Sequence, residues 1–88
     1  MKVEFKRSFV QDLERVRDKG IKERVRETIE RVGGAQTLQE MGSVKKLRDG
    51  ERYYRIRIGD YRLGLILQAN TVIFVRFLHR KDVYRYFP

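Results

Sequence analysis

The chain has 88 residues, of which 41% are hydrophobic and 38% are charged, and 21 Lys and Arg stand against 12 Asp and Glu. This length predicts one domain over residues 1–88 with a single small core. The absence of cysteine excludes disulfides and thiolate metal sites. No apolar run approaches the ~20 residues of a membrane span, and the first residues lack the apolar stretch of a signal peptide. We therefore expect a cytoplasmic protein with no membrane contact.

The first half of the chain has the pattern of one strand followed by two amphipathic helices. Residues 3–5 alternate as a short strand does. Ser8 and Gln11 have the spacing of a capping box at the start of the first helix, which Gly20 is expected to end. A second helix is expected over residues 21–32.

The second half has the pattern of an antiparallel meander. Strands are expected at 52–58, 61–68 and 71–79, joined by short turns, with a final helical turn in residues 79–88. Both faces of the last two strands are largely apolar, so a face that the helices leave uncovered would be an exposed partner site. We predict an α+β fold of order β-α-α-β-β-β. A short N-terminal strand comes first, an antiparallel two-helix hairpin packs on one face of a mainly antiparallel sheet, and a short helical tail follows.

Arginines recur on and after the first strand of this meander. Arg55 and Arg57 share one face of that strand, and Arg62 follows its turn closely. The net charge of +9 indicates an acidic partner, and arginine forks bind phosphate oxygens in a bidentate manner. Aromatic residues near these arginines can stack on unpaired bases. RNA is the anion that suits this set best.

Few residue patterns in this sequence could support catalysis. No His, Asp and Glu cluster has metal-ligand spacing, no glycine-rich phosphate loop is present, and no serine has a matched base. We expect neither a metal nor a cofactor. RNA carries its own nucleophile, the 2′-hydroxyl, so cleavage needs positioning, charge stabilisation and proton transfer. His79 is the single histidine of the chain and the candidate base, while Tyr84 is a candidate acid or stacking platform.

Ordinary structural roles account for the same residues. The strand arginines can be exposed residues balanced by nearby carboxylates, His79 can be structural, and Tyr84 can close the edge of the core. From the residues alone, a nucleic-acid binder and an enzyme are about equally supported. The candidate catalytic residues are Arg55, Arg57, Arg62, Arg80, Tyr84 and His79. The candidate RNA-binding residues are Lys45, Lys46, Arg48, Lys81 and Arg85.

Two segments carry a family resemblance. Residues 54–63, Tyr-Arg-Ile-Arg-Ile-Gly-Asp-Tyr-Arg-Leu, and residues 79–85, His-Arg-Lys-Asp-Val-Tyr-Arg, resemble the RelE toxins of toxin–antitoxin modules. The resemblance covers nearly the whole chain. It implies a compact domain that enters the ribosomal A site and cleaves mRNA there. It also implies a RelB-like antitoxin, which we expect on the exposed sheet face.

The resemblance also assigns roles. The basic active-site residues of the family map onto Arg55, Arg57, Arg62 and Arg80, and its C-terminal tyrosine maps onto Tyr84. The best-studied branch has lysines where Arg55 and Arg57 stand, so this chain keeps the charge and loses any lysine base there. Because no lysine is present at these two positions, His79 becomes a stronger candidate for the general base.

Two alternatives belong to other functional classes. ParE-like relatives with this fold inhibit DNA gyrase by binding, without cutting RNA. A non-catalytic RNA-binding or ribosome-binding module would have the same charge pattern without nuclease activity.

Overall fold

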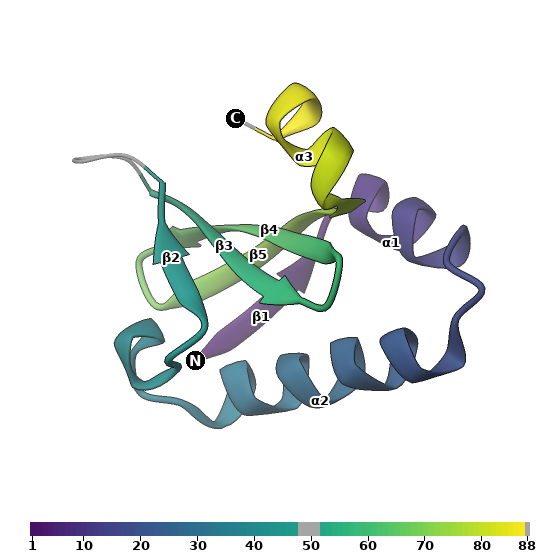
Figure 1. The fold of residues 1–88 in the computed structure, drawn as a ribbon. Coiled ribbons are helices and arrows are strands. Elements are labelled where there is room, and N and C mark those ends of the chain that lie inside the picture. The colour runs from purple at the N-terminus through teal and green to yellow at the C-terminus, as the bar shows by residue number, and fades with distance from the viewer. Residues whose placement is uncertain (48–51, 88) are drawn as a thin grey trace.

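The structure is a computed structural model that describes residues 1–47 and 52–87. In chain order its elements are β1 (Lys2–Phe5), α1 (Arg7–Glu14), α2 (Lys19–Gly34), a 3-10 turn (Leu38–Glu40), β2 (Val44–Lys46), β3 (Tyr53–Ile58), β4 (Tyr61–Gln68), β5 (Thr71–His79) and α3 (Arg80–Tyr86) (Figure 1). None of the helices in these ranges is long and apolar enough to cross a membrane.

The five strands within the described residues form one mixed sheet. Their order is β1-β5-β4-β3-β2, and only β1 pairs in parallel, with β5. The predicted meander and the α+β class are confirmed, with the strand bounds within one residue. The tight turn between β3 and β4 needs a residue with positive φ, and Gly59 supplies it at 57°.

The core lies between one face of this sheet and the helices α1 and α2. Alternate residues of β3 point into it, as the strand pattern predicts, and Ile56 and Ile58 are 1% and 2% exposed. Phe9 of α1 and Val25 of α2 belong to the same buried cluster. Both helices therefore cover one face, which orients the strand arginines toward the other.

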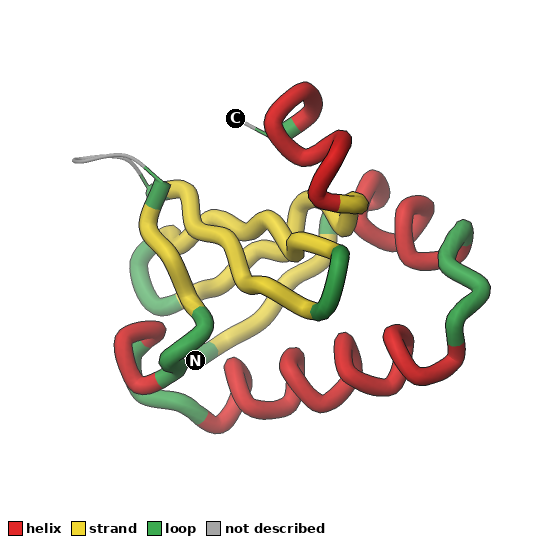
Figure 2. The backbone as a smooth tube through the Cα atoms, in the orientation of Figure 1, coloured by secondary structure: helices red, strands yellow, loops and turns green. Residues whose placement is uncertain are grey.

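The helix α3 packs on the opposite face of the sheet (Figure 2). Its Val83 and the following Phe87 are 0% and 4% exposed. The face that we expected to be exposed is therefore partly covered by the chain's own last helix. The apolar residues Ile66 and Ile73 remain half-buried on this face.

The helix boundaries differ from the predicted ones. Ser8 lies inside α1, and its hydroxyl donates to the carbonyl of Val75 on β5 at 2.6 Å instead of capping the helix. Gly20 lies in the first turn of α2, whose N-cap is Asp18; the Asp18 carboxylate accepts from the amides of Gly20 and Ile21. An aspartate N-cap satisfies the free backbone amides at the start of a helix. The second helix therefore begins after Asp18, and Gly20 lies inside it.

Candidate functional site

A row of cross-strand neighbours runs over the sheet face that carries α3. Lys45 is opposite Arg55, Arg55 is opposite Gly64, and Gly64 is opposite Arg76. Arg57 and Arg62 form the neighbouring cross-strand pair. Directly opposed residues have Cβ atoms about 5 Å apart, so the sheet register gathers the predicted strand arginines on one surface.

Tyr84 of α3 joins this surface. The Arg55 Cζ lies 4.7 Å from the centroid of the Tyr84 ring, and Tyr84 is 77% exposed. Arg80 precedes Tyr84 by four residues in α3, which places the two on one side of the helix. We call Lys45, Arg55, Arg57, Arg62, Arg80 and Tyr84 the arginine–tyrosine cluster.

The cluster changes the acidity of its phenol. Hydrogen bonding to Arg55 and the charge of Arg55 lower the pKa of Tyr84 below the usual value, and the charges of Lys45 and Arg62 act in the same direction. Positive neighbours stabilise the phenolate, so a lowered pKa is the expected response.

The backbone of the β3–β4 turn fixes one guanidinium of the cluster. The Arg62 Nη1 donates to the carbonyls of Gly59 at 3.0 Å and Tyr61 at 2.9 Å. Arg57 is exposed, and its side chain makes no hydrogen bond or ion pair within residues 1–47 and 52–87. One arginine is thus held in place, while its cross-strand neighbour is available to an incoming anion.

A close contact between Gly64 and Phe87 seats α3 on the sheet. A Cβ atom at Gly64 would lie 2.7 Å from the Phe87 ring, which is closer than real contacts allow. Tyr53 meets the same ring edge-on with centroids 5.8 Å apart. The glycine therefore lets the helix approach closely enough to bring Tyr84 to Arg55.

His79 lies apart from the cluster. Its Nδ1 accepts a hydrogen bond from the Lys81 amide at 3.2 Å, which caps α3. Its ring packs edge-on against Tyr61, with centroids 5.5 Å apart, and Tyr61 stacks on the buried Phe77. The histidine thus faces the α1 side of the sheet, where a cavity of about 250 Å³ also touches Asp12.

The other predicted RNA-binding residues are dispersed. Lys46 is opposite Tyr54, on the face turned away from the cluster. Lys81 and Arg85 are exposed on α3 and lie one turn apart, and Arg48 lies outside the described residues. Among the described members of this set, only Lys45 joins the cluster, a proximity that the sequence did not reveal because the three residues of β2 are too few to show a strand pattern.

Sequence reasoning also missed the role of Arg76. Its guanidinium donates to the carboxylate of Asp12 at 2.7 and 3.0 Å, and Cζ lies 5.7 Å from the centroid of the Tyr86 ring. Asp12 also accepts from the Phe77 amide at 3.0 Å. Arg76 therefore connects α1, β5 and α3, and its only sequence signal was a charge within an apolar strand.

Within residues 1–47 and 52–87, no group of three or more His, Cys, Asp or Glu side chains is placed to hold a metal ion. The cluster combines fixed cations, an acidified phenol and free aromatic surface. These are the elements of a site for a phosphate-bearing polymer.

Comparisons with known proteins identify the family and the fold. The family model for the ParE toxin of the type II toxin–antitoxin system parDE matches residues 3–84. Toxin RelE3 of Methanocaldococcus jannaschii is 42% identical over the full length of both chains. This chain belongs to the RelE/ParE superfamily of type II toxin–antitoxin toxins.

Solved structures share the fold. A RelB–RelE antitoxin–toxin complex from Methanococcus jannaschii matches at 39% identity with a TM-score of 0.82, over 97% of this chain and 99% of the other. An archaeal RelE–RelB complex from Pyrococcus horikoshii OT3 matches at 23% identity with a TM-score of 0.74, over 90% and 93% of the two chains. The second similarity concerns the fold alone.

Proposed function

We propose that the chain is a ribosome-dependent mRNA endonuclease that inhibits translation in the cytoplasm. The observation that supports this proposal most directly is the Arg55–Tyr84 contact, because it joins strand arginines and a phenol of α3 in one exposed site. The similarity to a protein named Toxin RelE3 over the full length points the same way.

The proposed reaction uses the nucleophile of the substrate. The 2′-oxygen of a nucleotide forms a bond to the adjacent phosphorus while the bond from phosphorus to the 5′-oxygen breaks. The products are a 2′,3′-cyclic phosphate and a free 5′-hydroxyl. The 2′-hydroxyl proton passes to water, and the leaving 5′-oxygen gains a proton. Negative charge accumulates on the phosphorane, where fixed cations stabilise it most.

The cluster residues divide this work. Arg55 and Arg62 stabilise the phosphorane, since one contacts the phenol and the other is pinned by backbone carbonyls. Arg57 and Arg80 bind the flanking phosphates. Tyr84 donates the proton to the 5′-oxygen, because a lowered pKa makes it a stronger acid than an ordinary tyrosine.

His79 has a structural role in this proposal. Its Nδ1 is engaged by the Lys81 amide, and its ring packs against Tyr61 on the side of the sheet away from the cluster. We therefore assign it to capping α3, and assign proton donation to Tyr84.

Induced expression followed by primer extension on cellular mRNA tests the proposal. Cuts should fall within codons at the ribosomal A site, and Arg55→Ala, Arg62→Ala and Tyr84→Phe should each lose cuts and growth inhibition. Arg17→Ala and Tyr86→Phe are matched controls, because both residues are exposed and lie outside the cluster. Full cleavage by the Arg62→Ala and Tyr84→Phe variants would overturn the site assignment.

A second candidate function rests on the matched family model, which describes ParE toxins. A gyrase inhibitor with this fold would arrest growth by binding, without cutting RNA. Supercoiling assays with purified gyrase distinguish the two functions. Inhibited supercoiling with intact mRNA would favour the gyrase inhibitor.

We also propose a RelB-like antitoxin as partner. The supporting observations are the net charge of +9 and the similarity to toxins crystallised as RelB–RelE complexes. We place the partner on the part of the sheet face that α3 leaves open, where Ile66 and Ile73 are half-buried apolar residues.

Co-expression with the neighbouring gene product tests this placement. Ile73→Asp should weaken the complex, whereas Val10→Asp on the exposed side of α1 should leave it intact. Equal affinity of both variants for the partner would move the interface elsewhere.

A further inference from the structure

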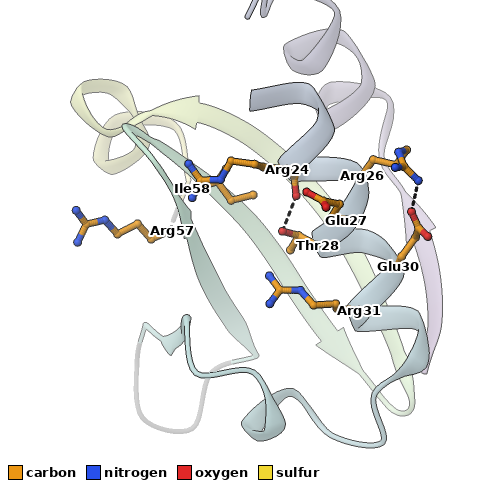
Figure 3. A pocket seen from close by; sticks show the side chains of 8 residues that line it. All are labelled: Arg24, Arg26, Glu27, Thr28, Glu30, Arg31, Arg57 and Ile58. Atoms are coloured by element: carbon orange, nitrogen blue, oxygen red, sulfur yellow. Dashed lines mark hydrogen bonds and ion pairs between the residues drawn. The ribbon is translucent and has the colours of Figure 1, made fainter. Parts of the chain in front are cut away.

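A second basic surface adjoins the arginine–tyrosine cluster, in a groove between α2 and the edge of β3 (Figure 3). The groove has a volume of about 610 Å³, which is within the range of ligand sites. Its lining residues are Arg24, Arg26, Glu27, Thr28, Glu30, Arg31, Arg57 and Ile58.

The charges of this groove do not cancel. Arg26 is paired with Glu23 and Glu30. Within residues 1–47 and 52–87, no ion pair joins Arg24, Arg31 or Arg57 to a carboxylate. Glu27 is the one acidic lining residue outside those pairs, so the groove keeps an excess of positive charge.

The arginines come from both sides of the groove. Figure 3 shows Arg24 and Arg31 extending from α2 toward the strand, and Arg57 leaving β3 on the side away from α2. An Arg24 Nη1 atom lies 3.3 Å from the position of a Cβ at Gly59, so this arginine borders the β3–β4 turn.

The groove is continuous with the cluster around the edge of the sheet. Arg57 lines the groove and is also the cross-strand neighbour of Arg62. The pairing of β2 with β3 ends at Val44 and Ile56, so β2 does not cover the strand edge at Arg57. A single anionic chain can therefore contact both surfaces through this residue.

The lining favours a phosphate backbone over a peptide. Protein partners bind through buried apolar or aromatic anchors, and Ile58 is the only large apolar side chain of the groove and is 2% exposed. Arginine forks alone suffice for phosphate oxygens. By contrast, a smaller cavity of about 270 Å³ is lined by Leu38, Met41, Val44 and Tyr54 and has the apolar character that a protein partner needs.

We propose that the α2–β3 groove is a second RNA-backbone site, in which Arg24 and Arg31 bind phosphates of the strand whose cleavage site lies at the cluster. Arg57 contacts the backbone between the two sites. This inference rests on the proposed RNA substrate. It adds a binding role to residues that take no part in the reaction.

Binding of a fluorescent single-stranded 12-nucleotide RNA to the purified protein, measured over a range of salt concentrations, tests the groove without requiring cleavage. Arg24→Ala and Arg31→Ala should each weaken binding and reduce the steepness of the salt dependence by about 0.7 in a plot of log K against log salt concentration. Glu27→Gln should strengthen binding, because it removes a repulsive charge. Lys22→Ala is the matched control, since Lys22 is exposed on α2 and does not line the groove.

The outcomes separate this inference from the proposed nuclease. If Arg24→Ala and Arg31→Ala show the same salt dependence as Lys22→Ala, the proposal that the groove binds RNA is wrong. The cluster variants would still test cleavage separately. The groove would stand if its variants weakened RNA binding in a protein that cuts no mRNA. If these variants lost affinity for a Glu-rich 12-residue peptide while keeping RNA affinity, the groove would be a protein-binding site and the proposal would be wrong.

Discussion

At the scale of single residues, Arg55 alters the acid strength of Tyr84. The folded pKa of this phenol lies below its unfolded value because of Arg55 first, then Lys45 and Arg62. A depressed pKa adds stability only as pH rises through the folded value, and this contribution is lost when pH falls below it. The contact therefore makes the phenol a stronger acid, and the stability linked to its ionisation is gained only as pH rises through the folded pKa.

Spectroscopic titration checks this effect directly. Among the five tyrosines, the first to ionise should disappear from the tyrosinate absorbance curve in Tyr84→Phe. In Arg55→Gln, that ionisation should move to higher pH. Tyr86→Phe, which changes an exposed tyrosine on another side of α3, should leave the first ionisation in place. An unchanged first ionisation in Tyr84→Phe would show that the cluster does not act on this phenol.

Asp12 is a buried charged residue whose loss should lower stability. It is 5% exposed and accepts from the Arg76 guanidinium and the Phe77 amide. Asp12→Ala leaves these donors without their acceptor, which we expect to cost about 2–4 kcal/mol of unfolding free energy. Urea denaturation measures this as a lower midpoint with an unchanged slope.

The matched control for Asp12 is Glu30. Its ion pair with Arg26 is exposed, with side chains 62% and 61% accessible. Glu30→Ala should change stability by less than about 1 kcal/mol. Equal losses in the two variants would mean that burial does not set the strength of the Asp12 contacts.

At the scale of elements, the placement of α3 depends on Gly64. The Phe87 ring occupies the space that a Cβ at this position needs. Gly64→Ala should therefore lift the helix and separate Tyr84 from Arg55, while the core on the other face stays packed. We expect the Tyr84 ionisation to shift toward that of an ordinary tyrosine, with cleavage reduced and the fold retained.

The double variant Gly64→Ala/Phe87→Leu is the compensating test. A smaller side chain at residue 87 relieves the clash, so the two changes should be non-additive. The measurements are the tyrosinate titration and the urea midpoint. Strict additivity of the two substitutions would show that the contact does not seat the helix.

Elements differ in how far the sequence predicts them. The meander followed from alternation over six or more residues in each strand, and the register brought the arginines together as their spacing suggested. The strand β2 has three residues, too few for a period to be visible. Its position decides where Lys45 lies, so that neighbour of Tyr84 could not be anticipated.

Tertiary contacts account for the other differences. Ser8 donates to Val75, 67 residues away, and no local pattern carries that information. A helical turn was expected in the tail, but its position on the sheet was not. The close approach of Phe87 to Gly64 makes that turn part of the site. The catalytic roles of the cluster residues stay predictions.

At the scale of the whole molecule, the charge of +9 makes association with a polyanion dependent on salt. If the five cations of the cluster each neutralise one phosphate, the slope of log affinity against log salt should be about −3.5. Raising salt fourfold should then weaken ribosome binding about a hundredfold, as measured by co-sedimentation with purified ribosomes. Tyr84→Phe should keep this slope because the phenol carries no positive charge, whereas Arg57→Ala/Arg80→Ala should make it shallower by about 1.4. A slope near zero would mean that ribosome binding relies on apolar contacts and that the basic surface serves another partner.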